Sequence, residues 1–75
     1  MAKTLSRGHK LFGLRVKELR VEREITQEDL AFKIGVDRSY MGFVERGERN
    51  PTLGKIIKIA KALDISLSEL FRGIK

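Results

Sequence analysis

The sequence predicts an all-α fold of five short helices, on three observations. Along most of the chain, apolar residues recur every three or four positions, which is the spacing of one face of an α-helix. A residue that favours helix N-caps precedes each of the last four apolar runs: Thr26, Asp37, Thr52 and Ser66. A glycine follows three of the runs, where helices commonly end: Gly35, Gly47 and Gly73. We therefore expect five helices, no strand and no second domain.

The N-terminal segment, residues 1–10, is polar and shows no apolar periodicity. It contains no acidic residue, and its basic residues are Lys3, Arg7 and Lys10. We expect it to be a flexible basic arm, or the fraying start of a helix, outside a packed domain that occupies residues 11–75. The first helix is predicted over residues 11–24. Its apolar face is formed by Phe12, Val16 and Leu19.

Residues 27–34 and 38–46 predict two helices joined by a tight turn. Gly35 lies where the chain must enter the left-handed region, which glycine adopts without a Cβ penalty. Ala31 lies where the two helices would cross at close range, so that a larger side chain would separate them. The apolar seam between them is expected from Leu30, Ile34, Val36, Met41 and Val44. This is the pattern of a helix-turn-helix unit, which in a basic chain usually inserts its second helix into the major groove of DNA.

The last two helices follow a loop of turn-forming residues, 47–51. Thr52 is expected to cap the fourth helix, in which an apolar stripe extends from residue 53 to residue 63. The lysines of that helix, Lys58 and Lys61 among them, should form a solvated stripe. Ser66 and Glu69 match a capping box for a short fifth helix over residues 67–72.

Composition limits the class of protein. The chain has 75 residues, which make one small domain near the lower limit for independent folding. It has no cysteine and one histidine, His9, so we expect neither disulfides nor a structural metal site. Sixteen Lys and Arg against ten Asp and Glu give a net charge of +6, which suits a polyanionic partner and a cytoplasmic setting. No apolar run approaches the ~20 residues of a membrane span, and no membrane association is expected.

Helical geometry predicts which residues of the 38–46 helix face away from the core. If Met41 and Val44 point inward, the opposite side near the N-terminal end carries the candidate base contacts. These are Arg38, Ser39, Gly42 and Phe43.

Among these candidates, Arg38 is the strongest, because its guanidinium can donate two hydrogen bonds to the O6 and N7 atoms of a guanine. The alternative is that Arg38 pairs with Asp37 or with a phosphate. Ser39 can bond to either a base or a phosphate. Gly42 would permit close approach of the backbone. Phe43 either contacts a thymine methyl group or packs against the fourth helix or the loop before it, since a large exposed aromatic side chain is costly to leave in water.

Three stretches of the chain, in their order and spacing, resemble the phage lambda repressor-like, or Cro/C1-type, helix-turn-helix family: LRVKELRVEREITQEDLA, IGVDRSYMGFVERGERNPT and IIKIAKALDISLSELF. The resemblance covers about residues 12–71 and implies a five-helix DNA-binding domain. The run DRSYMGFVERGERNPT is also similar to the small controller regulators of restriction-modification systems. In the family, polar side chains usually occupy the positions of Gly42 and Phe43, so this chain departs from the pattern there.

Several further residues are expected to bind the DNA backbone. Gln27 begins a helix whose N-terminal N–H groups can bind a phosphate together with its amide side chain, as the matching glutamine does in the family. Tyr40 either binds a phosphate or covers the start of that helix. The resemblance implies a second group of phosphate contacts: Arg46, Arg49, Asn50, Thr52 and Lys55. It also implies a partly buried, structural ion pair between Arg20 and Glu45.

One domain of this kind contacts only about half a turn of duplex, so useful affinity should need two copies related by a twofold axis. The C-terminal segment has more apolar residues than one short helix can bury. We expect a homodimer interface formed by Ile59, Ile65, Leu67, Leu70, Phe71 and Ile74.

The leading function is a sequence-specific transcriptional regulator that binds a pseudo-palindromic operator in double-stranded DNA as a homodimer. The alternative is an antitoxin that regulates its own transcription and neutralises a toxin with another surface, although a short chain leaves few residues for that surface. An enzyme is poorly supported, since one histidine and no cysteine provide no nucleophile and base pair. We expect no cofactor, metal or small-molecule ligand.

Overall fold

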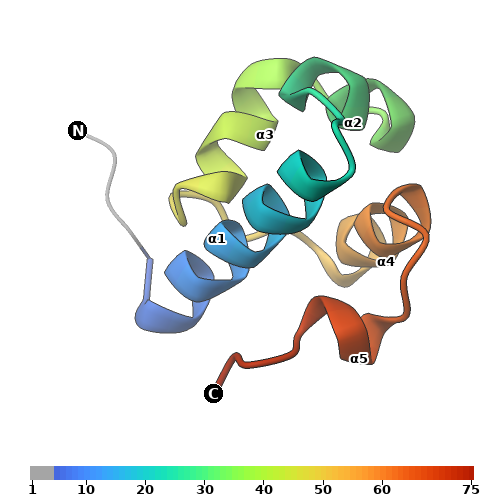
Figure 1. Cartoon of the computed structure of the whole chain (residues 1–75). Helices are drawn as coiled ribbons and strands as arrows, with labels where there is room; N and C mark the ends of the chain where they lie inside the picture. Colours follow the sequence, from blue (N-terminus) through green and yellow to red (C-terminus); the bar gives the residue numbers. More distant parts are fainter. Residues whose placement is uncertain (1–4) are drawn as a thin grey trace.

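The computed structural model describes residues 5–75, which are all-α. The five helices are α1 (Arg7–Glu22), α2 (Gln27–Ile34), α3 (Arg38–Glu45), α4 (Leu53–Ala62) and α5 (Leu67–Leu70). Helix α3 packs against both α1 and α2, α2 also packs against α4, and α5 lies beside α4 (Figure 1). The predicted fold class is confirmed, and no strand occurs in residues 5–75.

The core is formed by side chains from every helix. Its buried members are Phe12, Val16, Leu19, Leu30, Ala31, Ile34, Met41, Val44, Ile59, Ala60, Leu63 and Leu70. The predicted seam between α2 and α3 is part of it, with Val36 partly buried against it. Gly35 ends α2 with φ of 77°, in the left-handed region, as expected.

Helix α1 begins earlier than the sequence predicts. Ser6 is its N-cap, and the Ser6 hydroxyl accepts a hydrogen bond from the His9 N–H at 3.2 Å. The Leu5 N–H donates to the Gly47 carbonyl at 3.0 Å. The prediction of a flexible arm is therefore wrong for residues 7–10, because a solvent-facing first turn needs a cap rather than apolar periodicity. Lys3 lies outside the described residues.

The other helix boundaries follow their predicted caps. The side-chain oxygens of Thr26, Asp37, Thr52 and Ser66 each accept a hydrogen bond from the N–H three residues further on. Three C-terminal ends come earlier than predicted: α1 ends at Glu22, α3 at Glu45 and α5 at Leu70. Beyond α1, Glu24 has φ of 56°, which is incompatible with a continuing helix.

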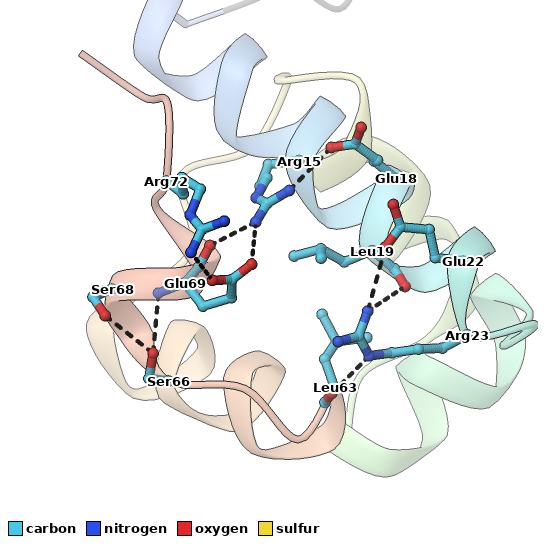
Figure 2. Close-up of polar contacts among 10 residues, drawn as sticks. All are labelled: Arg15, Glu18, Leu19, Glu22, Arg23, Leu63, Ser66, Ser68, Glu69 and Arg72. Carbon is cyan, nitrogen blue, oxygen red and sulfur yellow. Dashed lines mark hydrogen bonds and ion pairs between the residues drawn. The ribbon is translucent and has the colours of Figure 1, made fainter.

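Polar contacts attach the C-terminal part of the chain to α1 (Figure 2). The Arg15 guanidinium donates to the Glu69 carbonyl at 2.8 Å and to the Glu69 carboxylate at 2.9 Å. The Arg23 guanidinium donates to the Leu63 carbonyl at 2.9 Å, which caps the end of α4. These contacts hold the four-residue helix α5 in one place, which its own backbone hydrogen bonds would not do.

Two residues of the predicted dimer interface belong to the core of the monomer. Ile59 and Leu70 are both 0% exposed, so neither side chain is available to a partner. The prediction is wrong for these two positions, because they fill the space between α4, α5 and α1. Leu67 and Phe71 are exposed, and Ile65 and Ile74 are half-buried.

Candidate nucleic-acid interface

The orientation of α3 is set by its N-cap and by its inner face. Asp37 accepts hydrogen bonds from the Tyr40 N–H at 2.9 Å and from the Ser39 hydroxyl at 2.8 Å. These two bonds, with a smaller contribution from the charge of Arg49, lower the pKa of the Asp37 carboxyl below its usual value. Met41 and Val44 are fully buried on the inner face. The opposite face of α3 is therefore turned toward solvent.

Arg38 lies on that outer face, in the first turn of α3, and is exposed. Within residues 5–75 its guanidinium has no ion-pair partner, so the predicted alternative of a pair with Asp37 is not formed. Ser39 is exposed beside it, with its hydroxyl donated to Asp37. In the first turn of α3, the Arg38 guanidinium is thus exposed and makes no ion pair with any residue in the range 5–75.

The two remaining base-contact candidates, Gly42 and Phe43, both lie beside the Arg46 side chain. Gly42 is buried, and a Cβ built on it would lie 3.1 Å from the Arg46 guanidinium. In the free protein the exposed side chain of Arg46 lies over Gly42, and close approach of a ligand to the Gly42 backbone stays a prediction. Phe43 is half-buried, and the guanidinium carbon of Arg46 lies 5.1 Å from the centre of its ring. The absence of a Cβ at Gly42 therefore makes room for the guanidinium of Arg46.

Arg49, in the loop after α3, also lies against aromatic rings. Its guanidinium carbon lies 5.3 Å from the centre of the Tyr40 ring and 6.0 Å from that of Phe43. Tyr40 is half-buried, and burial raises the pKa of its hydroxyl. Tyr40 packs against the core and not simply over the start of α2. The outer face of α3 thus combines three arginines with two aromatic rings.

The other predicted phosphate contacts have defined partners or positions. The Gln27 amide donates one of its two N–H groups to the Glu45 carboxylate at 2.9 Å, so its other N–H and the backbone N–H groups at the start of α2 can still bind a phosphate. The Thr52 hydroxyl accepts from the Lys55 N–H at 3.2 Å as the cap of α4. Asn50 is exposed and Lys55 half-buried. Asn50, Thr52 and Lys55 thus lie around the start of α4 and close in sequence to Arg49.

The ion pair between Arg20 and Glu45 is present. Arg20 donates from Nε to Glu45 Oε2 at 2.7 Å and from Nη2 to Oε1 at 3.1 Å, and both residues are buried. Arg20 also donates to the Ile25 carbonyl at 2.7 Å. Because Gln27 binds the same carboxylate, Glu45 connects α1, the start of α2 and the end of α3.

One basic hollow beside α3 was not foreseen as a unit. It has a volume of about 460 Å³. Its lining residues are Lys10, Leu14, Lys17, Gln27, Glu45, Arg46 and Glu48, so the basic side chains outnumber the acidic ones by three to two. Lys10, Leu14 and Lys17 lie four and three residues apart, on one face of α1. That spacing is visible in the sequence, but it becomes informative only when α1 is known to extend back to residue 7.

Two negative findings apply to the described part of the chain. In residues 5–75, no helix is long and apolar enough to span a bilayer. Nowhere in the same range do three His, Asp or Glu side chains gather in a way that could hold a metal ion.

Comparison with known proteins gives consistent matches over most of the chain. A family model described as helix-turn-helix matches residues 16–70. The chain is 43% identical over 65 residues to control protein C.MunI of Mycoplasma sp. This match covers 85% of this chain and 88% of that protein. The crystal structure of the restriction-modification controller protein C.AhdI from Aeromonas hydrophila matches with a TM-score of 0.85 and 52% identity, over 88% of this chain and 100% of that one. SinR, solved in complex with DNA, matches with a TM-score of 0.73 and 34% identity, over 80% of this chain and 97% of that one.

Proposed function

The chain belongs to the helix-turn-helix family of DNA-binding transcriptional regulators, and on that premise we propose that it binds a pseudo-palindromic operator as a homodimer. The observation that carries the proposal is the uncommitted guanidinium of Arg38 on the exposed first turn of α3. Insertion of this end of α3 into the major groove brings Arg38 to the edges of the bases.

In this mode of binding, Arg38 discriminates between base pairs. A guanidinium that donates to both O6 and N7 of a guanine rejects other bases by ~1–3 kcal/mol. Ser39 can add a bond to a base or to a phosphate by rotating its hydroxyl away from Asp37. The proposal assigns no catalytic residue and requires no cofactor, metal or small ligand.

Phosphate contacts position α3 without reading sequence. We assign them to the N-terminal N–H groups of α2 and to side chains on both flanks of α3. These are Gln27, Tyr40, Arg46, Arg49, Asn50, Thr52 and Lys55. Gln27 would bind a phosphate through its other amide N–H or through its backbone N–H.

Dimerisation is assigned to the exposed apolar residues near α5. Leu67 is 40% exposed and Phe71 is 38% exposed, with Ile65 and Ile74 half-buried beside them. A twofold axis through this surface would separate two copies of α3 by ~34 Å, which is one turn of B-DNA. The target would then be a pseudo-palindrome with half-sites at that spacing.

Similarity to C.MunI and C.AhdI supports a narrower role as a controller of a restriction-modification system. In this role the protein would act in the cytoplasm of a prokaryote, at the nucleoid. The narrower role predicts genes for a restriction endonuclease and a DNA methyltransferase next to this one. Neighbouring genes of unrelated function would contradict it and leave the DNA-binding proposal intact.

The direct test is footprinting of the promoter upstream of the gene with purified protein. The proposal predicts two protected half-sites about one helical turn apart, with weaker protection by Arg38→Ala at the same protein concentration. Lys58→Ala serves as the control, because Lys58 is an exposed residue of α4 to which we assign no DNA contact. Protection that is absent for the wild type, or unchanged in Arg38→Ala, would contradict the proposal.

A further inference from the structure

Phe43 is the one side chain of α3 that both flanking arginines share. The guanidinium carbon of Arg46 lies 5.1 Å from the centre of its ring, and that of Arg49 lies 6.0 Å from the same centre. We propose that Phe43 is a positioning residue, which holds these two guanidinium groups ready to bind the phosphates of the duplex. This inference rests on the DNA binding proposed above.

The two arginines reach the ring from different parts of the backbone. Arg46 is the C-cap of α3, one helical turn after Phe43, while Arg49 comes back from the loop that follows. Arg49 also lies 5.3 Å from the centre of the Tyr40 ring, which is one turn before Phe43. Tyr40 and Phe43 therefore form an aromatic strip that carries both cations along the edge of α3.

Contact with an aromatic face leaves an arginine able to bind a phosphate. The attraction uses the flat face of the guanidinium, whereas its N–H donors point outward in the plane of the group. Arg46 donates its Nε to Glu48 at 3.2 Å, and in residues 5–75 its terminal nitrogens make no hydrogen bond. The Arg46 side chain is thus held by the Phe43 ring and by the Glu48 carboxylate, and its terminal nitrogens still present free donors.

Fixing these side chains in the free protein favours binding. A long, flexible side chain loses rotamer freedom when it is immobilised at an interface, and that loss weakens affinity. A side chain that is already held loses less on binding. Gly42 contributes to the same arrangement, since a Cβ there would lie 3.1 Å from Arg46.

This role differs from the thymine contact considered for Phe43 on sequence grounds. A ring that touches a thymine methyl group should matter only where the operator has that methyl group. A ring that positions Arg46 and Arg49 should matter equally with or without it, and only while the arginines are present. The two roles therefore predict different results for the same variants.

The first experiment uses the free protein and no DNA. Side-chain NMR of the arginines should show ring-current shifts at Arg46 that disappear in Phe43→Leu and persist in Phe43→Tyr. Phe32→Leu is the matched control, because Phe32 is an 86% exposed phenylalanine on α2. Arg46 resonances that are identical in the wild type and in Phe43→Leu would overturn the proposal.

The second experiment measures the affinity of the same variants for a labelled duplex that carries the motif recovered from randomised duplexes. Phe43→Leu should bind about fivefold more weakly, Phe43→Tyr should bind like the wild type, and uracil in place of thymine should not change either ratio. In an Arg46→Ala/Arg49→Ala background, Phe43→Leu should cause no further loss.

Three results of the second experiment would overturn the proposal. Phe43→Leu could bind as tightly as the wild type, or its loss of affinity could vanish on the uracil duplex. Phe43→Leu could also cause the same loss of affinity in the Arg46→Ala/Arg49→Ala background as in the wild type. Circular dichroism of each variant verifies that it is folded, and Phe43→Met, which also lacks an aromatic ring, replaces Phe43→Leu with the same expected results if Phe43→Leu is not. A wild type that binds no duplex would instead contradict the function proposed above, whatever the NMR result.

Discussion

Gly13 of α1 lies so close to the end of α3 that a Cβ built on it would be 2.5 Å from the carbonyl oxygen of Glu45. The same Glu45 carries the carboxylate that binds Arg20 of α1, at 2.7 Å. Close backbone approach and an ion pair thus fix α3 on α1 from two sides. The outer face of α3 is presented at an angle that this junction determines.

Gly13→Ala should destabilise the fold by ~1–3 kcal/mol, because the added methyl group meets backbone atoms that cannot move aside. Gly8→Ala is the matched control on the same helix, since its Cβ would lie 3.6 Å from the Ser6 hydroxyl oxygen, an ordinary contact. There, alanine should stabilise the helix slightly. Thermal unfolding by circular dichroism measures both. Equal melting temperatures for the two variants would contradict the close contact.

Glu45→Ala should cost ~3–5 kcal/mol, because it leaves the buried Arg20 without a counter-charge. A domain of this size has little stability to lose, so the variant should be largely unfolded at room temperature. Replacing both Arg20 and Glu45 by methionine should recover much of the loss, since no buried charge remains. Urea titration compares the three proteins. If Glu45→Ala were as stable as the wild type, the structural role of the ion pair would be contradicted.

Asp37 should make stability depend on pH in the acid range. Its hydrogen bonds to the Tyr40 N–H and the Ser39 hydroxyl hold its folded-state pKa below the usual 3.8. For a carboxyl with a lowered pKa, the stabilisation is complete above the unfolded pKa and is lost as the pH falls through the folded pKa. Asp37→Asn keeps a good N-cap without a titrating group.

The stability difference between the wild type and Asp37→Asn should therefore remain constant above about pH 5 and change as the pH falls below about pH 5. Urea unfolding at a series of pH values measures it. A difference that stays constant through the acid range would show that Asp37 is not held by these bonds.

Leu67→Asp should convert the dimer to a monomer, because it places a charge in the proposed apolar interface. Leu67 is 40% exposed, so the change should leave the monomer folded. Phe32→Asp, at an 86% exposed position on α2, should remain dimeric. Sedimentation velocity at micromolar concentration distinguishes the species. A wild type that is monomeric with and without DNA would rule out the dimer.

The caps and the turn were predictable from the sequence because they follow local rules. Thr26 and Asp37 cap α2 and α3 through bonds to N–H groups three residues away, and Gly35 adopts a positive φ. The Arg20 and Glu45 pair was implied only by resemblance to a family. Its geometry requires two helices to meet, which no local pattern specifies.

The errors arose where packing between distant segments decides the outcome. Ile59 and Leu70 were assigned to a dimer surface because apolar residues were counted without knowing which ones the monomer buries. Gly13 has no local signature, since its reason lies on α3. The start of α1 was missed because Ser6 and Leu5 bind polar partners, and apolar periodicity does not detect such contacts.

Selection from randomised duplexes, carried out in parallel with the wild type and Arg38→Ala, tests DNA recognition by α3 most directly. The wild type should enrich a pseudo-palindromic motif with half-sites ~34 Å apart, and Arg38→Ala should lose the preference for one guanine in each half-site. Failure of the wild type to enrich any motif, or enrichment of the same motif by Arg38→Ala, would contradict recognition of DNA by this face of α3.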